Sequence, residues 1–180
     1  RSLTLYDELP LDDQGPIGAD KFPVLYDIRK ECHTMTAMDY MLGNGAYPLK
    51  GIILTAANPA VSNPNTAKVE KALSNLDLLV VSDFFMTKTA RLAHYILPAA
   101  TFLEREELHF YPTRHLVNLT SKVARTEGIK TEYQLWHNLA HGLGFGDKYF
   151  PWKSEKDVNK WLLEPSGLTV EKLRRHPQGY

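Results

Sequence analysis

The chain has 180 residues, long enough to bury a sizeable core, and its composition, 43% hydrophobic and 23% charged, is that of an ordinary globular domain. Because 21 basic residues balance 21 acidic ones, no net field recruits nucleic acid or an anionic membrane surface, and no apolar run approaches the roughly 20 residues of a membrane span. With Cys32 as its one cysteine, the chain can form no intrachain disulfide and holds no cysteine cluster for an iron–sulfur centre.

The N-terminal part consists of a loop-like lead-in followed by one predicted helix. Proline and glycine punctuate residues 1–23 and disfavour regular structure there. From Pro23 to Leu42 apolar residues recur at helical spacing, which predicts a continuous helix that ends in a glycine-containing turn at 43–45. We expect Cys32 and the three methionines of this stripe to pack in the core, the cysteine being neither a reactive thiol nor a metal ligand.

The central part of the chain alternates strand and helix. Residues 51–55 and 78–81 are short apolar runs bounded by turn residues, as in strands buried on both faces of a sheet. Between them, a helical stripe predicts an amphipathic helix that begins near Thr66; its apolar members are Val69, Ala72, Leu73 and Leu76. Two strands joined by such a helical crossover form a parallel pair.

Polar residues follow both predicted strands, at the edge where such units bind ligands. Asn58 follows the first strand, and Ser82 and Asp83 follow the second. An aspartate there can accept two hydrogen bonds from a ribose diol or from the N–H edge of guanine, and the N-terminus of the intervening helix suits a phosphate. The chain lacks a glycine-rich dinucleotide fingerprint, so a nucleotide site and a purely structural unit both remain open.

One stretch of the chain resembles a known family. Residues 57–106 read ANPAVSNPNTAKVEKALSNLDLLVVSDFFMTKTARLAHYILPAATFLERE. The NP loop, the helix, the VVSD strand, the TKTA helix start and the LPAATFLE segment are similar in order and spacing to the third domain of molybdopterin oxidoreductases. These are the large catalytic subunits related to dimethyl sulfoxide reductase, periplasmic nitrate reductase and formate dehydrogenase. A looser similarity runs from residue 15 to residue 145.

The resemblance implies a fold, a cofactor and a set of binding residues. The implied fold is α/β, an open, mostly parallel sheet with flanking helices (Rossmann-like), plus a small helical C-terminal extension. The implied cofactor is a molybdenum or tungsten ion held by two molybdopterin guanine dinucleotides, with this domain binding the nucleotide end of one of them. By position in the motifs, the cofactor-binding residues are Asn58, Ser82, Asp83, Arg105 and Glu132; none of them is catalytic or binds the metal. An amide, a hydroxyl, a cation and two carboxylates suit a polar, anionic dinucleotide.

Two positions depart from the usual pattern of the family. His94 stands where many relatives have an acid, and Lys88 stands where glutamate is common. Neither residue is an inferred ligand, so the nucleotide interpretation holds. The departures leave open the branch of the family to which the chain belongs.

The residues that follow the second strand predict a third strand and a further pair of extended segments. A short helix over 87–95 leads into a strand over 95–98. Residues 108–123 show partial alternation of apolar and polar side chains, which predicts a hairpin or an edge strand.

The last third of the chain is predicted to be helical. Thr131 and Gln134 resemble a capping box for a helix that ends at 142–146. Ser154 and Thr169 are the expected N-caps of two shorter helices. The final four residues are expected to fray.

The helix after residue 131 carries a competing motif. His137 and His141 lie four residues apart on one face, as two zinc ligands would. The zinc hydrolase pattern also needs a glutamate after the first histidine, where this chain has Asn138. No third ligand occurs at a sequence spacing that is typical of zinc sites. The simpler interpretation is that both histidines are partly exposed helix residues without a metal.

The combined reading divides the chain into a lead-in at 1–23, an α/β cofactor-binding domain at 24–146 and a short helical extension at 147–180 that packs on it. We expect an excised piece of a molybdopterin-dependent oxidoreductase, inactive alone. Its expected partners are the remaining domains of the same catalytic subunit and, as a further candidate, an iron–sulfur electron-transfer subunit; neither nucleic acid nor direct membrane insertion is expected. A 4Fe-4S cluster is expected in the intact enzyme but is not held by these residues.

The alternative is a stand-alone α/β nucleotide-binding or regulatory module without redox activity. It predicts a well-behaved monomer that binds a common nucleotide, whereas an excised domain predicts exposed apolar faces. The sequence leaves open the substrate, the choice of molybdenum or tungsten, and the compartment, because relatives work in both the prokaryotic cytoplasm and the periplasm.

Overall fold

The computed structural model describes residues 15–29 and 31–180, so most of the predicted lead-in lies outside the described residues. Contacts divide the chain into two compact units, one reaching Leu97 and the other starting at Pro98. The domain limits expected from the sequence, at residues 23 and 146, stay a prediction. No helix within the described ranges is long and apolar enough to cross a membrane.

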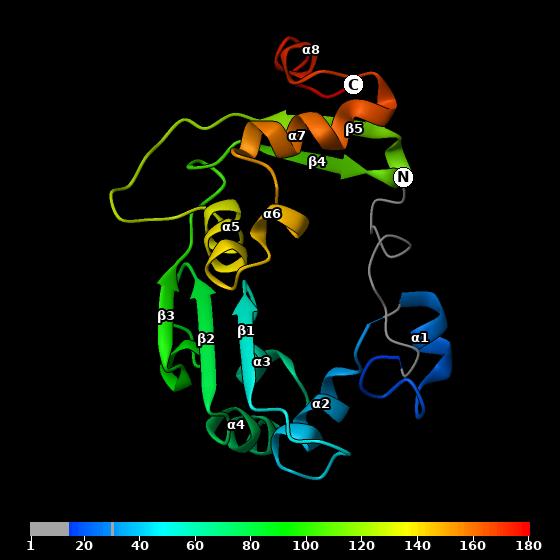
Figure 1. Cartoon of the computed structure of the whole chain (residues 1–180), viewed down its shortest axis with the longest axis vertical. Helices are drawn as coiled ribbons and strands as arrows, with labels where there is room; N and C mark the ends of the chain where they lie inside the picture. Colours follow the sequence, from blue (N-terminus) through cyan, green and yellow to red (C-terminus); the bar gives the residue numbers. More distant parts are fainter. Residues whose placement is uncertain (1–14, 30) are drawn as a thin grey trace. The chain divides into compact units, whose positions relative to one another are not determined.

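The first unit is built on a three-stranded sheet. Its strands are β1 (Gly51–Thr55), β2 (Leu78–Asp83) and β3 (Tyr95–Pro98), in the order β1-β2-β3. Strands β1 and β2 are parallel, with Thr55 opposite Ser82, and the three arrows point the same way in Figure 1. The predicted class, α/β with a parallel sheet and flanking helices, is confirmed.

The crossover between β1 and β2 follows the sequence prediction. After the short α3 (Pro59–Ser62), helix α4 (Thr66–Ser74) begins at Asn65, whose side chain accepts a hydrogen bond from the Lys68 backbone N–H at 3.3 Å. The predicted stripe of α4 is buried, and it packs with the central strand to form the core; the fully buried members are Val69, Ala72, Leu73, Leu79 and Val81.

Strand β1 is less enclosed than the sequence predicted. Gly51 is exposed and the other four residues are only partly buried, whereas β2 buries Leu79 and Val81 completely. The expectation of burial on both faces was therefore wrong for β1. It lies at the edge of the sheet, with only β2 beside it.

The single helix predicted from Pro23 to Leu42 is two helices, α1 (Pro23–Arg29) and α2 (Thr34–Met41). They are separated because His33 leaves helical geometry: its N–H donates to the Ile17 carbonyl at 2.9 Å and its ring accepts from the Thr36 N–H. The apolar residues keep their helical spacing across this break, so the sequence pattern does not indicate it.

The break also corrects the prediction for the cysteine. Cys32 lies between the two helices and is exposed, not packed in the core. Val24 and Ile28 on α1 are likewise 70% and 72% exposed. The methionines of α2 behave as expected, since Met38 and Met41 are each 2% exposed.

The helix predicted over 87–95 is much shorter, a 3-10 turn at Ala90–Leu92. The Thr87 hydroxyl accepts the Ala90 N–H at 3.1 Å, and Ala93 is already extended. The chain then enters β3 where the sequence placed it.

The second unit contains the predicted hairpin and the C-terminal helices. Strands β4 (Glu107–Tyr111) and β5 (Leu116–Thr120) pair antiparallel, which confirms the hairpin. The helices of this unit are α5 (Glu132–Gly142), α6 (Gly146–Tyr149), α7 (Glu155–Leu163) and α8 (Val170–Arg174). One face of the hairpin and the last two helices share a core of Leu108, Leu119, Leu163, Val170 and Leu173.

The helix starts of the second unit follow the predicted caps. Thr131 and Gln134 form the capping box of α5, and Ser154 and Thr169 cap α7 and α8. The predicted fraying of the C-terminus is wrong: Tyr180 exchanges two backbone hydrogen bonds with Val117, at 2.8 and 3.0 Å. The chain end thus adds to the hairpin, a pairing that local sequence cannot reveal.

Candidate functional site

The carboxyl edge of β1 and β2 brings three of the predicted cofactor residues into one unit. Thr55 and Ser82 are the last paired residues of β1 and β2, and the Ala56 N–H donates to the Ser82 carbonyl at 3.0 Å. Ala56 has a positive φ of 50°, so the chain turns sharply as it leaves β1. Asn58 follows this turn, and Asp83 ends β2.

Asn58 joins the two loops at this edge. Its side-chain oxygen Oδ1 accepts from the Thr89 hydroxyl at 2.7 Å and from the Thr89 N–H at 3.3 Å. The Thr89 hydroxyl in turn accepts the Ala60 N–H at 3.1 Å, and Thr89 is fully buried. The oxygen of Asn58 is therefore used within the fold, and its Nδ2 group is left as the donor for a ligand.

Ser82 and Asp83 supply a hydroxyl and a carboxylate. Ser82 is 4% exposed, while Asp83 is half-buried. One oxygen of Asp83, Oδ1, accepts the Phe85 N–H at 3.2 Å, which fixes the side chain in a local turn. Within the described chain, Oδ2 of Asp83 makes no hydrogen bond, so it can accept from a ligand.

The two departures from the family pattern have structural roles. The ring nitrogen Nδ1 of His94 accepts the Leu79 backbone N–H at 2.8 Å, and the backbone N–H of His94 donates to the Leu79 carbonyl at 2.8 Å. Lys88 forms an ion pair with Glu70 of α4. His94 thus links the segment before β3 to β2, and Lys88 links the loop after β2 to α4.

The other two predicted cofactor residues, Arg105 and Glu132, line one pocket of the second unit, with a volume of about 270 Å³. Arg105 Nε lies 2.9 Å from Glu107 Oε2 as an ion pair that lacks hydrogen-bond geometry, since neither atom has a hydrogen-bond partner among the described residues. Four glutamates line it with one arginine, and one of them, Glu106, is paired with Arg174, so the net lining is acidic through Glu107, Glu132 and Glu155.

Sequence reasoning missed Asn159 in this pocket. It is 7% exposed, and its Nδ2 has no hydrogen-bond partner among the described residues. A polar residue at a buried position of an amphipathic helix was the available signal.

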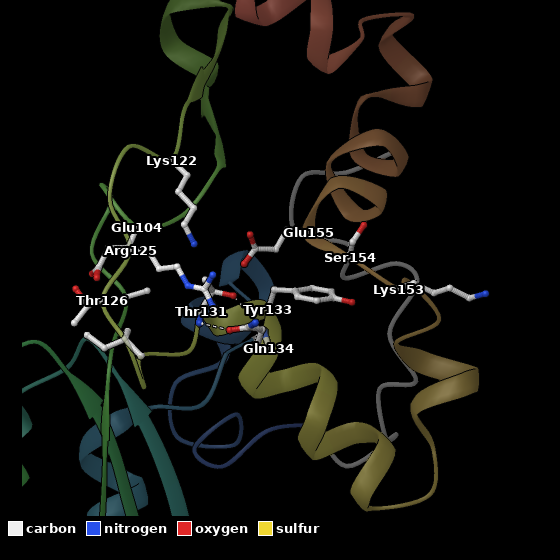
Figure 2. Close-up of a pocket in the computed structure, with 12 residues that line it drawn as sticks. Glu104, Lys122, Arg125, Thr126, Thr131, Tyr133, Gln134, Lys153, Ser154 and Glu155 are labelled. Carbon is white, nitrogen blue, oxygen red and sulfur yellow. Dashed lines mark hydrogen bonds between the residues drawn. The ribbon is translucent and has the colours of Figure 1, made fainter.

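A second pocket of this unit, of about 360 Å³, was also missed. Figure 2 shows Lys122, Arg125 and Glu155 pointing toward one space, whereas Lys153 points away. Tyr133 lines it too, and its hydroxyl donates to the Trp152 carbonyl at 2.7 Å. Burial, together with nearby acidic groups, raises the pKa of Tyr133, so the phenol stays neutral.

Glu104 at the same pocket organises the loop before the hairpin. It is 7% exposed, and Oε2 accepts from the Thr101 N–H at 2.9 Å and from its hydroxyl at 3.0 Å. Hydrogen bonds from Thr126 and Thr101 hold the pKa of this carboxyl below its usual value. The carboxylate is therefore ionised; its Oε2 holds this loop, while its buried Oε1 has no hydrogen-bond partner among the described residues.

The two histidines of α5 lie close together without a third ligand. The rings of His137 and His141 are 4.3 Å apart, and Asp147 Oδ1 lies 3.8 Å from His141 Nδ1. Across residues 15–29 and 31–180, no group of three or more His, Cys, Asp or Glu is placed to hold a metal ion. The zinc alternative gains no support from this arrangement.

Comparison with known proteins identifies the family. A sequence model described as molybdopterin oxidoreductase matches residues 27–141, more than half of the chain. The chain belongs to the molybdopterin oxidoreductase family. The resemblance read from residues 57–106 is thereby confirmed.

Individual relatives agree with the family assignment. The chain is 36% identical over 138 residues to the F420-dependent formate dehydrogenase subunit alpha of Methanocaldococcus jannaschii, covering 74% of the chain and 20% of that protein. It is 34% identical over 142 residues to the assimilatory nitrate reductase catalytic subunit of Bacillus subtilis, covering 71% and 19%. The structure is similar to acetylene hydratase from Pelobacter acetylenicus, with a TM-score of 0.71 at 30% identity, covering 80% of this chain and 20% of that one. The chain thus spans about a fifth of the length of these relatives.

Membership of the family implies a pterin cofactor of molybdenum or tungsten. The edge of β1 and β2 fits a polar organic group of this kind, since it offers an amide donor, a hydroxyl and a carboxylate oxygen from Asn58, Ser82 and Asp83. The second unit offers Arg105 and Glu132 in one pocket.

Proposed function

We propose that this chain is the part of a molybdopterin-dependent oxidoreductase subunit that binds the guanine nucleotide end of a bis(molybdopterin guanine dinucleotide) cofactor. When bound, the metal of that cofactor supplies two-electron redox chemistry. The residues of this chain hold and orient the nucleotide. We also propose that the intact enzyme contains the remaining domains of this subunit and a 4Fe-4S cluster, and that it works with an electron-transfer subunit.

The observation that carries the proposal is the unused hydrogen-bonding capacity at the edge of the sheet. Asp83 keeps Oδ2 for the N–H edge of guanine or for a ribose diol, and Asn58 keeps Nδ2 as a donor. Ser82 adds a hydroxyl at the end of the same strand. These groups lie at the carboxyl ends of parallel strands, where open α/β sheets bind their ligands.

Arg105 and Glu132 remain proposed contacts of the cofactor. The carboxylates around them determine which part of the nucleotide they can bind. Arg105 is already paired with Glu107, and further carboxylates line the same pocket. A pyrophosphate placed there would be repelled, whereas sugar hydroxyls or a base N–H would be accepted. Taken within the second unit alone, the pocket of Arg105 and Glu132 therefore suits nucleoside groups better than phosphates.

The proposal is tested by substituting Asp83 with alanine in the intact catalytic subunit and measuring bound molybdenum and tungsten by mass spectrometry. We expect the metal content per protein to fall, because the nucleotide loses an acceptor at its binding edge. Asp77→Ala is the matched control, since Asp77 is an exposed carboxylate just before the other end of β2, 3.4 Å from Lys50. Equal metal content in Asp83→Ala and the unsubstituted subunit contradicts the assigned role.

A further inference from the structure

The loop after β2 exposes three consecutive large apolar side chains. Phe84, Phe85 and Met86 are 51%, 75% and 55% exposed. Apolar surface that stays in water gives up roughly 25 cal/mol of favourable burial free energy per Å². A contiguous exposed run of this kind therefore indicates a surface that binds another molecule.

The exposure is imposed by a loop that is fixed at both ends. At its start the Phe85 N–H donates to Asp83 Oδ1 at 3.2 Å, and the Thr87 N–H donates to the Phe85 carbonyl at 2.8 Å. At its end the buried Thr89 is held by Asn58. The backbone therefore presents these side chains to solvent, although neighbouring core positions are fully buried.

The same loop begins directly after the carboxylate of the proposed nucleotide site. We propose that the 84–86 loop is the apolar wall of the base site, with Phe85 stacked on the face of the purine whose N–H edge bonds to Asp83. This inference rests on the proposed function and adds the residue that contacts the ring. Stacking on an aromatic side chain is a general way of holding a base, because every base has a π-face.

A purine suits this edge better than a protein surface does. Asp83 Oδ2 and Asn58 Nδ2 make no hydrogen bond within the described part of the chain. An apolar protein surface that packed on Phe85 would remove water from these adjacent polar groups without offering them hydrogen-bond partners, which would cost binding free energy. A base covers the apolar loop and pairs the polar groups at the same time.

The test is a calorimetric titration of the intact catalytic subunit, prepared without its cofactor, with GMP, AMP and ribose 5-phosphate, which carries the sugar and phosphate without a base. For Phe85→Ala we expect GMP and AMP affinities to fall at least about fivefold, as for loss of one base–aromatic stack, with ribose 5-phosphate unchanged. Phe85→Leu, which keeps apolar area without the ring, should show a smaller loss. Leu78→Ala, 41% exposed at the amino end of the same strand, is the control and should leave all three affinities unchanged.

The outcomes separate this inference from the proposed function. Unchanged GMP affinity in Phe85→Ala overturns the stacking role while the nucleotide site stands. An equal loss for GMP and ribose 5-phosphate also overturns it, because the loop then acts only by shaping the edge. If the unsubstituted subunit binds no GMP, the proposed function fails, and the base site fails with it.

Discussion

Asn58 and Thr89, 31 residues apart, share the hydrogen bond that joins the two loops at the ligand edge of the sheet. The Thr89 hydroxyl lies 2.7 Å from Asn58 Oδ1, and it also accepts the Ala60 N–H at 3.1 Å. Because Thr89 is fully buried, water cannot replace either bond. The polar groups of the edge are thus held in place before any ligand arrives.

Replacing Thr89 with valine should lower the free energy of unfolding by about 1–3 kcal/mol, because Asn58 and the Ala60 N–H each lose a buried partner. Thr89→Ser keeps the hydroxyl and should cost less. Urea denaturation of the two variants measures the difference. Equal losses would show that the methyl group, and not the hydroxyl, matters at this position.

Two glycines of the second unit should respond to alanine with opposite signs. A Cβ on Gly146 would lie 2.3 Å from the His141 ring, so Gly146→Ala should cost about 1–3 kcal/mol of stability. A Cβ on Gly142, at the end of α5, meets nothing within 4 Å. Gly142→Ala should therefore be neutral or stabilising by up to about 1 kcal/mol, and thermal unfolding of both variants checks the pair.

Glu104 should make stability depend on pH in the acidic range. Hydrogen bonds from Thr126 and Thr101 lower its pKa below the usual 4.5, so the unfolded chain binds a proton at higher pH than the folded one. The contribution is fully present above that usual value and is lost as the pH falls through the lower, folded pKa. Glu104→Gln should flatten this part of the profile of unfolding free energy against pH. Parallel profiles for the two proteins would contradict it.

The C-terminus should be protected from hydrogen exchange. Tyr180 exchanges two backbone hydrogen bonds with Val117, and Lys172 Nζ lies 4.1 Å from the Tyr180 ring centre. Deleting residues 178–180 should raise the exchange rate of the Val117 amide and lower stability by about 1 kcal/mol. An unprotected Val117 amide in the chain that keeps residues 178–180 would restore the sequence-based expectation of a frayed end.

Features with a local cause were predictable from the sequence. The buried face of α4 follows from the spacing of Val69, Ala72 and Leu73, and the start of α5 follows from Thr131 with Gln134. The parallel order of β1 and β2 follows from the helical crossover between them. Each of these features depends on residues that are near one another in the sequence, so it can be predicted from local sequence patterns.

Features with a tertiary cause were not predictable. The break before α2 depends on a hydrogen bond from His33 to Ile17, and apolar spacing continues across it. At the candidate site, the motif identified Asn58 but not that Thr89 occupies its oxygen. Asn159 escaped notice because its burial depends on how α7 packs.

The most direct test of the nucleotide site is to map GMP binding on the 180-residue chain by backbone amide shifts. We expect the largest shifts at Asn58 and over residues 82–89, and we expect Asp83→Asn to weaken GMP more than AMP, because the carboxylate reads the guanine N–H edge. Binding that leaves these amides unshifted, or that shifts only the pocket of Lys122 and Arg125, would contradict the site. No binding of GMP at any accessible concentration would contradict the proposed function itself.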